Sequence, residues 1–75
     1  MSTVNIGDTN AGFKVIAVKK GAAGHISIVL AEKLSGEAGA VYVTWAFDHS
    51  MGFFKWGMYC DDRTEAEKTF KSRKE

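Results

Sequence analysis

The sequence predicts one small α+β domain over residues 1–75, in which a four-stranded antiparallel meander is followed by one C-terminal helix. Four runs of β-branched and aromatic residues predict the strands. The connections of about four to six residues between these runs suit antiparallel neighbours and are too short for crossover helices. The last segment, 61–75, changes to good helix formers. The predicted strands are Phe13 to Lys19, His25 to Leu34, Val41 to Phe47 and Phe53 to Cys60.

Composition limits the classes of protein to which the chain can belong. Ten basic and nine acidic side chains leave a net charge of +1, which gives no long-range electrostatic case for nucleic acid or anionic membrane. Cys60 is the only cysteine, so an internal disulfide and a cysteine-rich zinc site are excluded. The start of the chain lacks signal-peptide character, and no apolar run approaches the roughly 20 residues that span a bilayer. We therefore expect a cytoplasmic protein.

Before the first of these strands, the segment MSTVNIGDTNAG predicts an additional short edge strand at Thr3 to Ile6. The second and third strands pair in a register that places His25 beside His49. The C-terminal helix begins at one of two N-caps, Asp62 or Thr64, since each has a glutamate three residues later. Glu67 and Lys71 are expected to pair on its outer face.

The hairpin of residues 41–60 carries seven of the nine aromatic residues. A turn at DHSMG places Phe47 opposite Phe53 and Trp45 opposite Lys55, and directly opposed residues share a face. The first face then receives Val41, Val43, Trp45, Phe47, Phe53, Lys55 and Tyr59. The second receives Tyr42, Thr44, Ala46, Phe54, Trp56 and Met58.

Both faces of this predicted sheet are largely apolar, and one short helix cannot cover them. A helix of about 12 residues is roughly 18 Å long and covers about half of one face. We expect Ala66 and Phe70 to pack on the more aliphatic face, with Trp56 in the core near Phe70. The other face is the predicted contact surface, since it mixes aromatics with a cation. Its residues are Trp45, Phe47, Phe53, Lys55 and Tyr59. The alternative is a strongly curled sheet in which all seven aromatics are core.

The candidate chemical sites are weak. The predicted hairpin separates Cys60 from His49 by roughly 26 Å, which argues against a thiolate–imidazole pair. His25, His49 and Asp48 could together ligate zinc, although turn residues of these types are commonly just solvated. The adjacent Asp61 and Asp62 are better explained as helix caps than as catalytic acids. The glycine-rich loops lack the context of a phosphate-binding motif. We expect no metal, no cofactor and no enzyme activity.

Three blocks of residues carry a resemblance to a known group. The blocks are Val43-Thr44-Trp45, then Phe54-Lys55-Trp56-Gly57-Met58-Tyr59, then Asp61-Asp62 and Glu65-Ala66-Glu67 with Phe70. In this pattern the chain resembles short uncharacterised proteins of bacteria, phage and other mobile elements. The resemblance covers roughly residues 40–73, departs from the pattern at Cys60, and implies a prokaryotic accessory gene without a known activity. The element order is also similar, in topology alone, to the dimeric positive-cofactor-4 type of single-stranded DNA-binding fold, whose strongly basic strands are missing here.

These observations favour a non-enzymatic protein-interaction module that acts as a homodimer or on an unidentified protein partner. The alternative is a single-stranded nucleic-acid binder, which would combine basic side chains with stacking aromatics. The residues for that alternative are Lys14, Lys33, Lys55, Trp45 and Tyr59.

Overall fold

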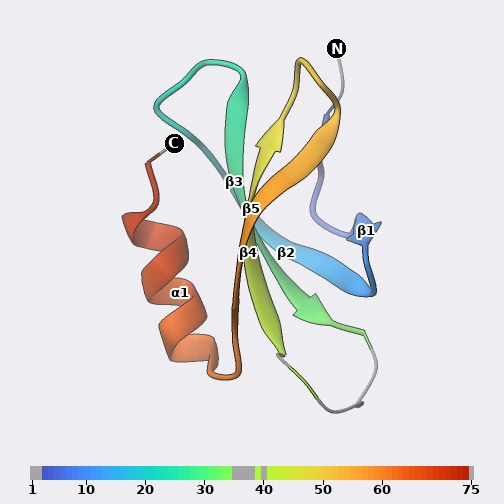
Figure 1. Ribbon diagram of the computed structural model, residues 1–75, viewed down its shortest axis with the longest axis vertical. Coiled ribbons are helices and arrows are strands. Elements are labelled where there is room, and N and C mark those ends of the chain that lie inside the picture. Colours follow the sequence, from blue (N-terminus) through green and yellow to red (C-terminus); the bar gives the residue numbers. More distant parts are fainter. Residues whose placement is uncertain (1–2, 35–38, 40, 75) are drawn as a thin grey trace.

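The computed structural model describes residues 3–34, 39 and 41–74 and confirms the predicted α+β fold (Figure 1). An antiparallel meander has the strand order β1-β2-β3-β4-β5 and is followed by the C-terminal helix α1. The bounds are β1 Thr9–Asn10, β2 Phe13–Lys20, β3 Ile26–Lys33, β4 Tyr42–Asp48, β5 Phe53–Cys60 and α1 Arg63–Ser72. In the described part of the chain, no helix has the length and apolar character that crossing a membrane requires.

The fifth strand lies at the N-terminal edge, as expected, but at Thr9–Asn10 and not at Thr3 to Ile6. The prediction misplaced it because Asn5 to Asp8 forms a turn, in which the Asn5 N–H donates to Asp8 Oδ2 at 2.8 Å and Gly7 has φ +101°. A second tight turn follows at Ala11 and Gly12, both with positive φ, which is the geometry of a two-residue hairpin. Residues 3–8, here called the N-terminal strap, bring Val4 into the core.

The register between β3 and β4 is the predicted one, with Ile26 opposite Asp48 and Ile28 opposite Ala46. One face of the sheet, the strap face, carries the larger core cluster, which includes Val15, Val29 and Trp45 together with Val4 of the strap. The opposite face, the helix face, carries Ile26, Ile28 and Ala46 with Phe70 of α1 packed against them. The prediction that the helix covers the aliphatic face is therefore confirmed at these positions.

The register between β4 and β5 differs from the predicted one. Phe47 lies opposite Phe54, not Phe53, and a β-bulge between Thr44 and Ala46 shifts the pairing again farther along. Because a shift of one residue moves side chains to the other face, Phe54 joins the strap-face cluster and Phe53 and Lys55 move to the helix face. The turn is one residue shorter than predicted, since Asp48 pairs with Phe53 and its side chain accepts hydrogen bonds from the turn backbone.

The helix begins after Asp62, whose side chain accepts a hydrogen bond from the Thr64 N–H at 3.2 Å. Of the two predicted N-caps, Asp62 is thus the one used. Glu67 pairs with Arg63 at 2.8 Å, whereas Lys71 was the predicted partner.

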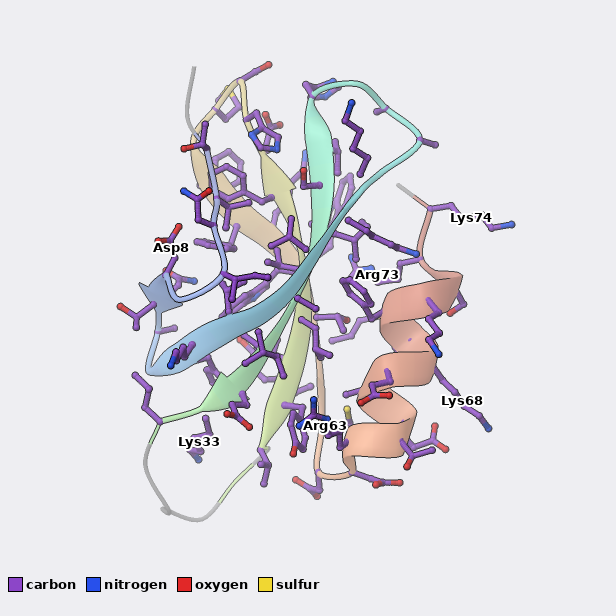
Figure 2. All side chains as sticks on the ribbon, turned by 180° about the vertical axis from the view of Figure 1, so that it is seen from behind. Asp8, Lys33, Arg63, Lys68, Arg73 and Lys74 are labelled. Carbon is purple, nitrogen blue, oxygen red and sulfur yellow. The ribbon has the colours of Figure 1, made fainter. Side chains whose placement is uncertain are left out.

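At the other end of α1, Arg73 extends from the helix toward the sheet, while the labelled Lys68 and Lys74 point away (Figure 2). Arg73 Nη1 donates to the carbonyl oxygen of Thr44 at 2.9 Å and to its hydroxyl at 3.1 Å. The ammonium of Lys19 donates to the Lys71 carbonyl at 2.8 Å and caps the last turn. These contacts fix the helix across the middle of β4.

Candidate interaction surface

Exposed apolar side chains gather on β5 and the turn before it. Among the described residues eight large hydrophobic side chains are exposed, and five of them lie between residues 51 and 59. β5 is also an edge strand, since it pairs only with β4. An exposed apolar edge strand favours association with another chain. The five are Met51, Phe53, Trp56, Met58 and Tyr59, with exposed fractions of 70%, 44%, 57%, 54% and 56%.

The bulge in β5 turns Trp56 out of the sheet. Trp56 has φ +55°, a left-handed conformation that is unusual for a bulky side chain and costs about 1–2 kcal/mol. The contact made by the next residue, Gly57, accounts for this strained conformation of Trp56. Trp45 of β4 packs over Gly57, where a Cβ would lie only 2.9 Å from the indole Nε1. The buried indole thus occupies the space that a side chain at position 57 would need, and the exposed indole of Trp56 lies outside the sheet.

Asp48 organises the turn that leads into β5. Its Oδ1 accepts hydrogen bonds from the backbone N–H groups of Ser50 and Met51, both at 2.9 Å. Its Oδ2 lies 3.2 Å from the ammonium of Lys55. The hydrogen bond from the Met51 N–H and, more weakly, Lys55 hold the pKa of this carboxyl below its usual value, although its partial burial opposes them.

Lys55 is held by rings as well as by Asp48. Its ammonium lies 4.2 Å from the ring centroid of Trp56 and 5.9 Å from that of Phe53. Cation–π contacts of this kind contribute about 0.5–1 kcal/mol at exposed sites. The carboxylate, the ammonium and the two rings therefore form a pre-ordered cluster on the helix face of β5.

The exposed residues wrap around the edge of the sheet. Phe53 and Lys55 lie on the helix face, opposite Asp48 and Ala46 of β4. Tyr59 lies on the strap face, opposite Val43, with its ring 5.9 Å from that of Phe13. We call the whole set the β5 surface: Met51, Phe53, Lys55, Trp56, Met58 and Tyr59.

Of the five residues predicted as a contact surface, the structure brings three to the β5 surface: Phe53, Lys55 and Tyr59. Trp45 and Phe47 are core residues instead, each only 4% exposed. Their rings pack on Phe54 at centroid distances of 5.0 and 4.9 Å. The predicted burial of Trp56 near Phe70 is wrong: Trp45 is the buried tryptophan and Trp56 the exposed one. Trp45 also cannot stack on a nucleic-acid base.

Met51, Trp56 and Met58 are the residues of this surface that sequence reasoning missed. The signal that could have found Trp56 is the glycine directly after it, opposite a large aromatic residue on the neighbouring strand. Glycine inside a strand pattern often marks a bulge or a close approach. A bulge at this point changes which side chains face outward.

The other candidate residues are separated or have structural roles. His25 and His49 are neighbours, as predicted, since the His49 N–H donates to the His25 carbonyl at 2.8 Å. Asp48, however, binds Lys55, and no three His, Cys, Asp or Glu side chains of the described chain are placed to hold a metal ion. Burial raises the pKa of the Cys60 thiol, whose sulfur donates to the Asp62 carbonyl at 3.7 Å. This is the opposite of nucleophile activation.

Comparison of the chain with protein-family models, curated proteins and solved structures found no match. The resemblance to bacterial and mobile-element proteins therefore stays a prediction, as does the topological similarity to the positive-cofactor-4 type of fold.

Proposed function

We propose that this protein is a non-enzymatic interaction module that forms a homodimer through the β5 surface. The observation that carries the proposal is the concentration of exposed apolar side chains on an edge strand, with Trp56 strained outward. Backbone strain at an exposed residue is typical of binding sites, where the contact made on binding offsets its cost. A cytoplasmic accessory protein of a bacterial or mobile-element gene would fit this role.

The β5 surface has the features of a protein contact. Trp56 and Tyr59 are aromatic anchors of the types that dominate binding energies at protein interfaces. Lys55 is already held by Asp48 and by two rings, so little side-chain entropy remains to be lost when it is covered. An unpaired strand edge supplies backbone donors and acceptors to a further strand.

A second copy of the chain is the partner that these charges favour. The β5 surface contains one cation, Lys55, and that cation is neutralised by Asp48 of the same chain. Two identical surfaces can therefore meet without repulsion between like charges. Antiparallel pairing of β5 with β5 about a two-fold axis satisfies both strand edges at once, as in an isologous dimer. It places Trp56 of each copy near the middle of the contact.

Two observations count against the nucleic-acid alternative. Trp45, one of its two stacking aromatics, is buried. Lys55, one of its three cations, is in contact with a carboxylate that would repel phosphate. Phe53 and Trp56 remain available for stacking, so an oligonucleotide titration belongs in the test.

The proposal is tested by sedimentation equilibrium over a range of protein concentrations. The wild type is expected to self-associate, and Trp56→Asn is expected to weaken that association by about tenfold or more. Asparagine tolerates the left-handed conformation, so this variant keeps the bulge and the fold. The matched control is Ile6→Ser, because Ile6 is 69% exposed and belongs to the strap beside the opposite edge of the sheet.

Two results would contradict the proposal. One is a wild-type protein that stays monomeric at all concentrations. The other is an equal loss of association in Ile6→Ser and Trp56→Asn. Quenching of tryptophan fluorescence by oligothymidylate at low salt, absent in Trp56→Asn, would favour the nucleic-acid alternative instead.

A further inference from the structure

A groove lies at the end of the sheet where the β2–β3 loop meets the β4–β5 turn and the strap. Figure 1 shows both of these loops and both ends of the described chain at this same end of the molecule. The groove has a volume of about 350 Å³. Its polar walls are Thr3, Lys20, Ser27 and His49, and its apolar walls include Ala23 and Ile26.

The polar walls are brought together by the sheet register. Lys20 of β2 lies directly opposite Ser27 of β3, so their side chains share the strap face. His49 Nε2 lies 2.7 Å from the hydroxyl oxygen of Ser27. The imidazole of His49 packs against the ring of Phe47 in a T-shaped contact, with a centroid distance of 5.0 Å. Three polar groups thus converge on one side of the groove from three different strands or turns.

The charge at this end of the molecule is basic. Lys20 is the charged residue of the described lining, and Lys74 lies close to the same loop, since its carbonyl accepts a hydrogen bond from the Ala22 N–H at 3.0 Å. Asp48, the carboxylate of the adjacent β4–β5 turn, is held by Lys55. None of the described residues that line the groove is acidic. A small anion is the ligand that such a field attracts.

We propose that this groove binds a small phosphomonoester, with the phosphate group against Lys20, Ser27 and His49. Lys20 supplies the ammonium. When His49 Nε2–H donates to Ser27 Oγ, the hydroxyl proton of Ser27 is free to donate to a phosphate oxygen. The hydroxyl of Thr3 adds a further donor. A tetrahedral group with several oxygens matches donors that arrive from several directions.

The organic part of the ligand lies against the β2–β3 loop at Gly21, Ala23 and Gly24, because the side chain of Ile26 is buried on the helix face. The groove is larger than a phosphate ion needs, and its volume is at the lower end of the range for small-molecule sites. Phosphate binding here uses side chains, not the backbone of a glycine-rich loop before a helix. The site shares no residue with the β5 surface, so its test does not depend on whether the proposed dimer forms.

The test is a ¹H–¹⁵N NMR titration of the protein with inorganic phosphate and, separately, with phenyl phosphate, at constant ionic strength. Both are expected to shift the same backbone amides in a saturable way. Phenyl phosphate is expected to bind more tightly and, unlike inorganic phosphate, to shift the methyl signal of Ala23 in ¹H–¹³C spectra recorded in parallel. The backbone amides expected to shift with both compounds are those of Gly21, Gly24, Ser27 and His49.

Variants separate a specific site from general attraction to a cationic surface. Lys20→Gln is expected to weaken phenyl phosphate binding by roughly tenfold, and Ser27→Ala to weaken it by a smaller factor. Lys14→Gln is the matched control, because Lys14 is an exposed lysine of the same strand on the far side of the bulge, opposite Glu32. It is expected to bind as the wild type does.

The proposal is overturned if neither phosphate compound shifts these amides in a saturable way. It is also overturned if Lys14→Gln weakens binding as much as Lys20→Gln does, since attraction would then follow net charge alone. Thermal unfolding of each variant confirms that the fold is retained before binding is compared.

Discussion

The buried indole of Trp45 packs over Gly57, where a Cβ would lie 2.9 Å from its Nε1 and 3.1 Å from its Cδ1. Because of this contact β5 bulges opposite Trp45, and the bulge turns Trp56 into solvent with φ +55°. The two tryptophans of the chain are therefore coupled: the packing of one in the core accounts for the exposure of the other. The proposed interface depends on this pair.

A side chain at position 57 is expected to disrupt the core. Gly57→Ala places a methyl group against the Trp45 ring and 3.1 Å from Tyr59 Cε1, and should cost about 1–3 kcal/mol in the free energy of unfolding. Gly24→Ala is the matched control, since nothing lies within 4 Å of its Cβ, and it should change stability little. Urea denaturation measures both. Equal stabilities of the two variants would mean that Trp45 does not pack on Gly57 as described.

The two tryptophans are expected to respond oppositely to truncation. Trp45→Ala removes a core side chain that is 4% exposed and should cost about 3–5 kcal/mol, enough to unfold so small a domain. Trp56→Ala removes a side chain that is 57% exposed and should change stability far less while weakening self-association. Circular dichroism during thermal unfolding, together with sedimentation, distinguishes them. If Trp56→Ala unfolds the chain and Trp45→Ala does not, the face assignment of the hairpin is wrong.

Arg73 is expected to stabilise the docking of α1. Its guanidinium donates twice to Thr44, which is fully buried. No buried side-chain nitrogen or oxygen of the described residues lacks a hydrogen-bond partner. Arg73→Met keeps an apolar stem but leaves the Thr44 oxygens without these donors, and should cost about 1–3 kcal/mol.

Arg63→Met is the control for that variant, because Arg63 makes its ion pair with Glu67 at the exposed surface. It should leave the denaturation midpoint unchanged. Similar losses of unfolding free energy in Arg73→Met and Arg63→Met would show that Arg73 acts only as another surface charge.

Asp48 is expected to make stability depend on acidic pH. Its folded-state pKa lies below the usual value, chiefly because the Met51 N–H donates to it. A carboxyl with a lowered pKa stabilises the fold at pH values above its unfolded pKa, and that contribution is lost as the pH falls through the folded pKa. The wild type should therefore lose more stability than Asp48→Asn as the pH falls below about 4. Parallel stability curves for the two proteins between pH 6 and pH 2 would contradict this role.

The sequence predicts those parts of the fold that depend on local patterns. The alternation in Ile26 to Leu30 and in β4 correctly placed β3 beside β4, and the helix signals correctly located α1 and offered Asp62 as its cap. The N-terminal edge strand was misplaced because the turn at Asn5 to Asp8 depends on the Asp8 side chain and on the conformation of Gly7.

The residues of the β5 surface were predicted only in part, because their exposure depends on a register that two local features change. Asp48 closes the turn with its side chain, which moves Phe53 and Phe54 to opposite faces from those expected. The bulge then restores the expected faces for Met58 and Tyr59. The first feature depends on a side chain that binds its own turn, and the second on the contact between Trp45 and Gly57, so periodicity along the strand could not reveal either.

The claim that β5 is the interface between two copies is tested most directly by isotope-filtered nuclear Overhauser measurements. An equimolar mixture of ¹³C,¹⁵N-labelled and unlabelled protein, at a concentration where sedimentation shows association, reports only contacts between copies. The account predicts intermolecular signals between β5 of one copy and β5 of the other, centred on Trp56 and Met58. Intermolecular signals confined to the opposite edge of the sheet around Ile6, or none at all at high protein concentration, would contradict it.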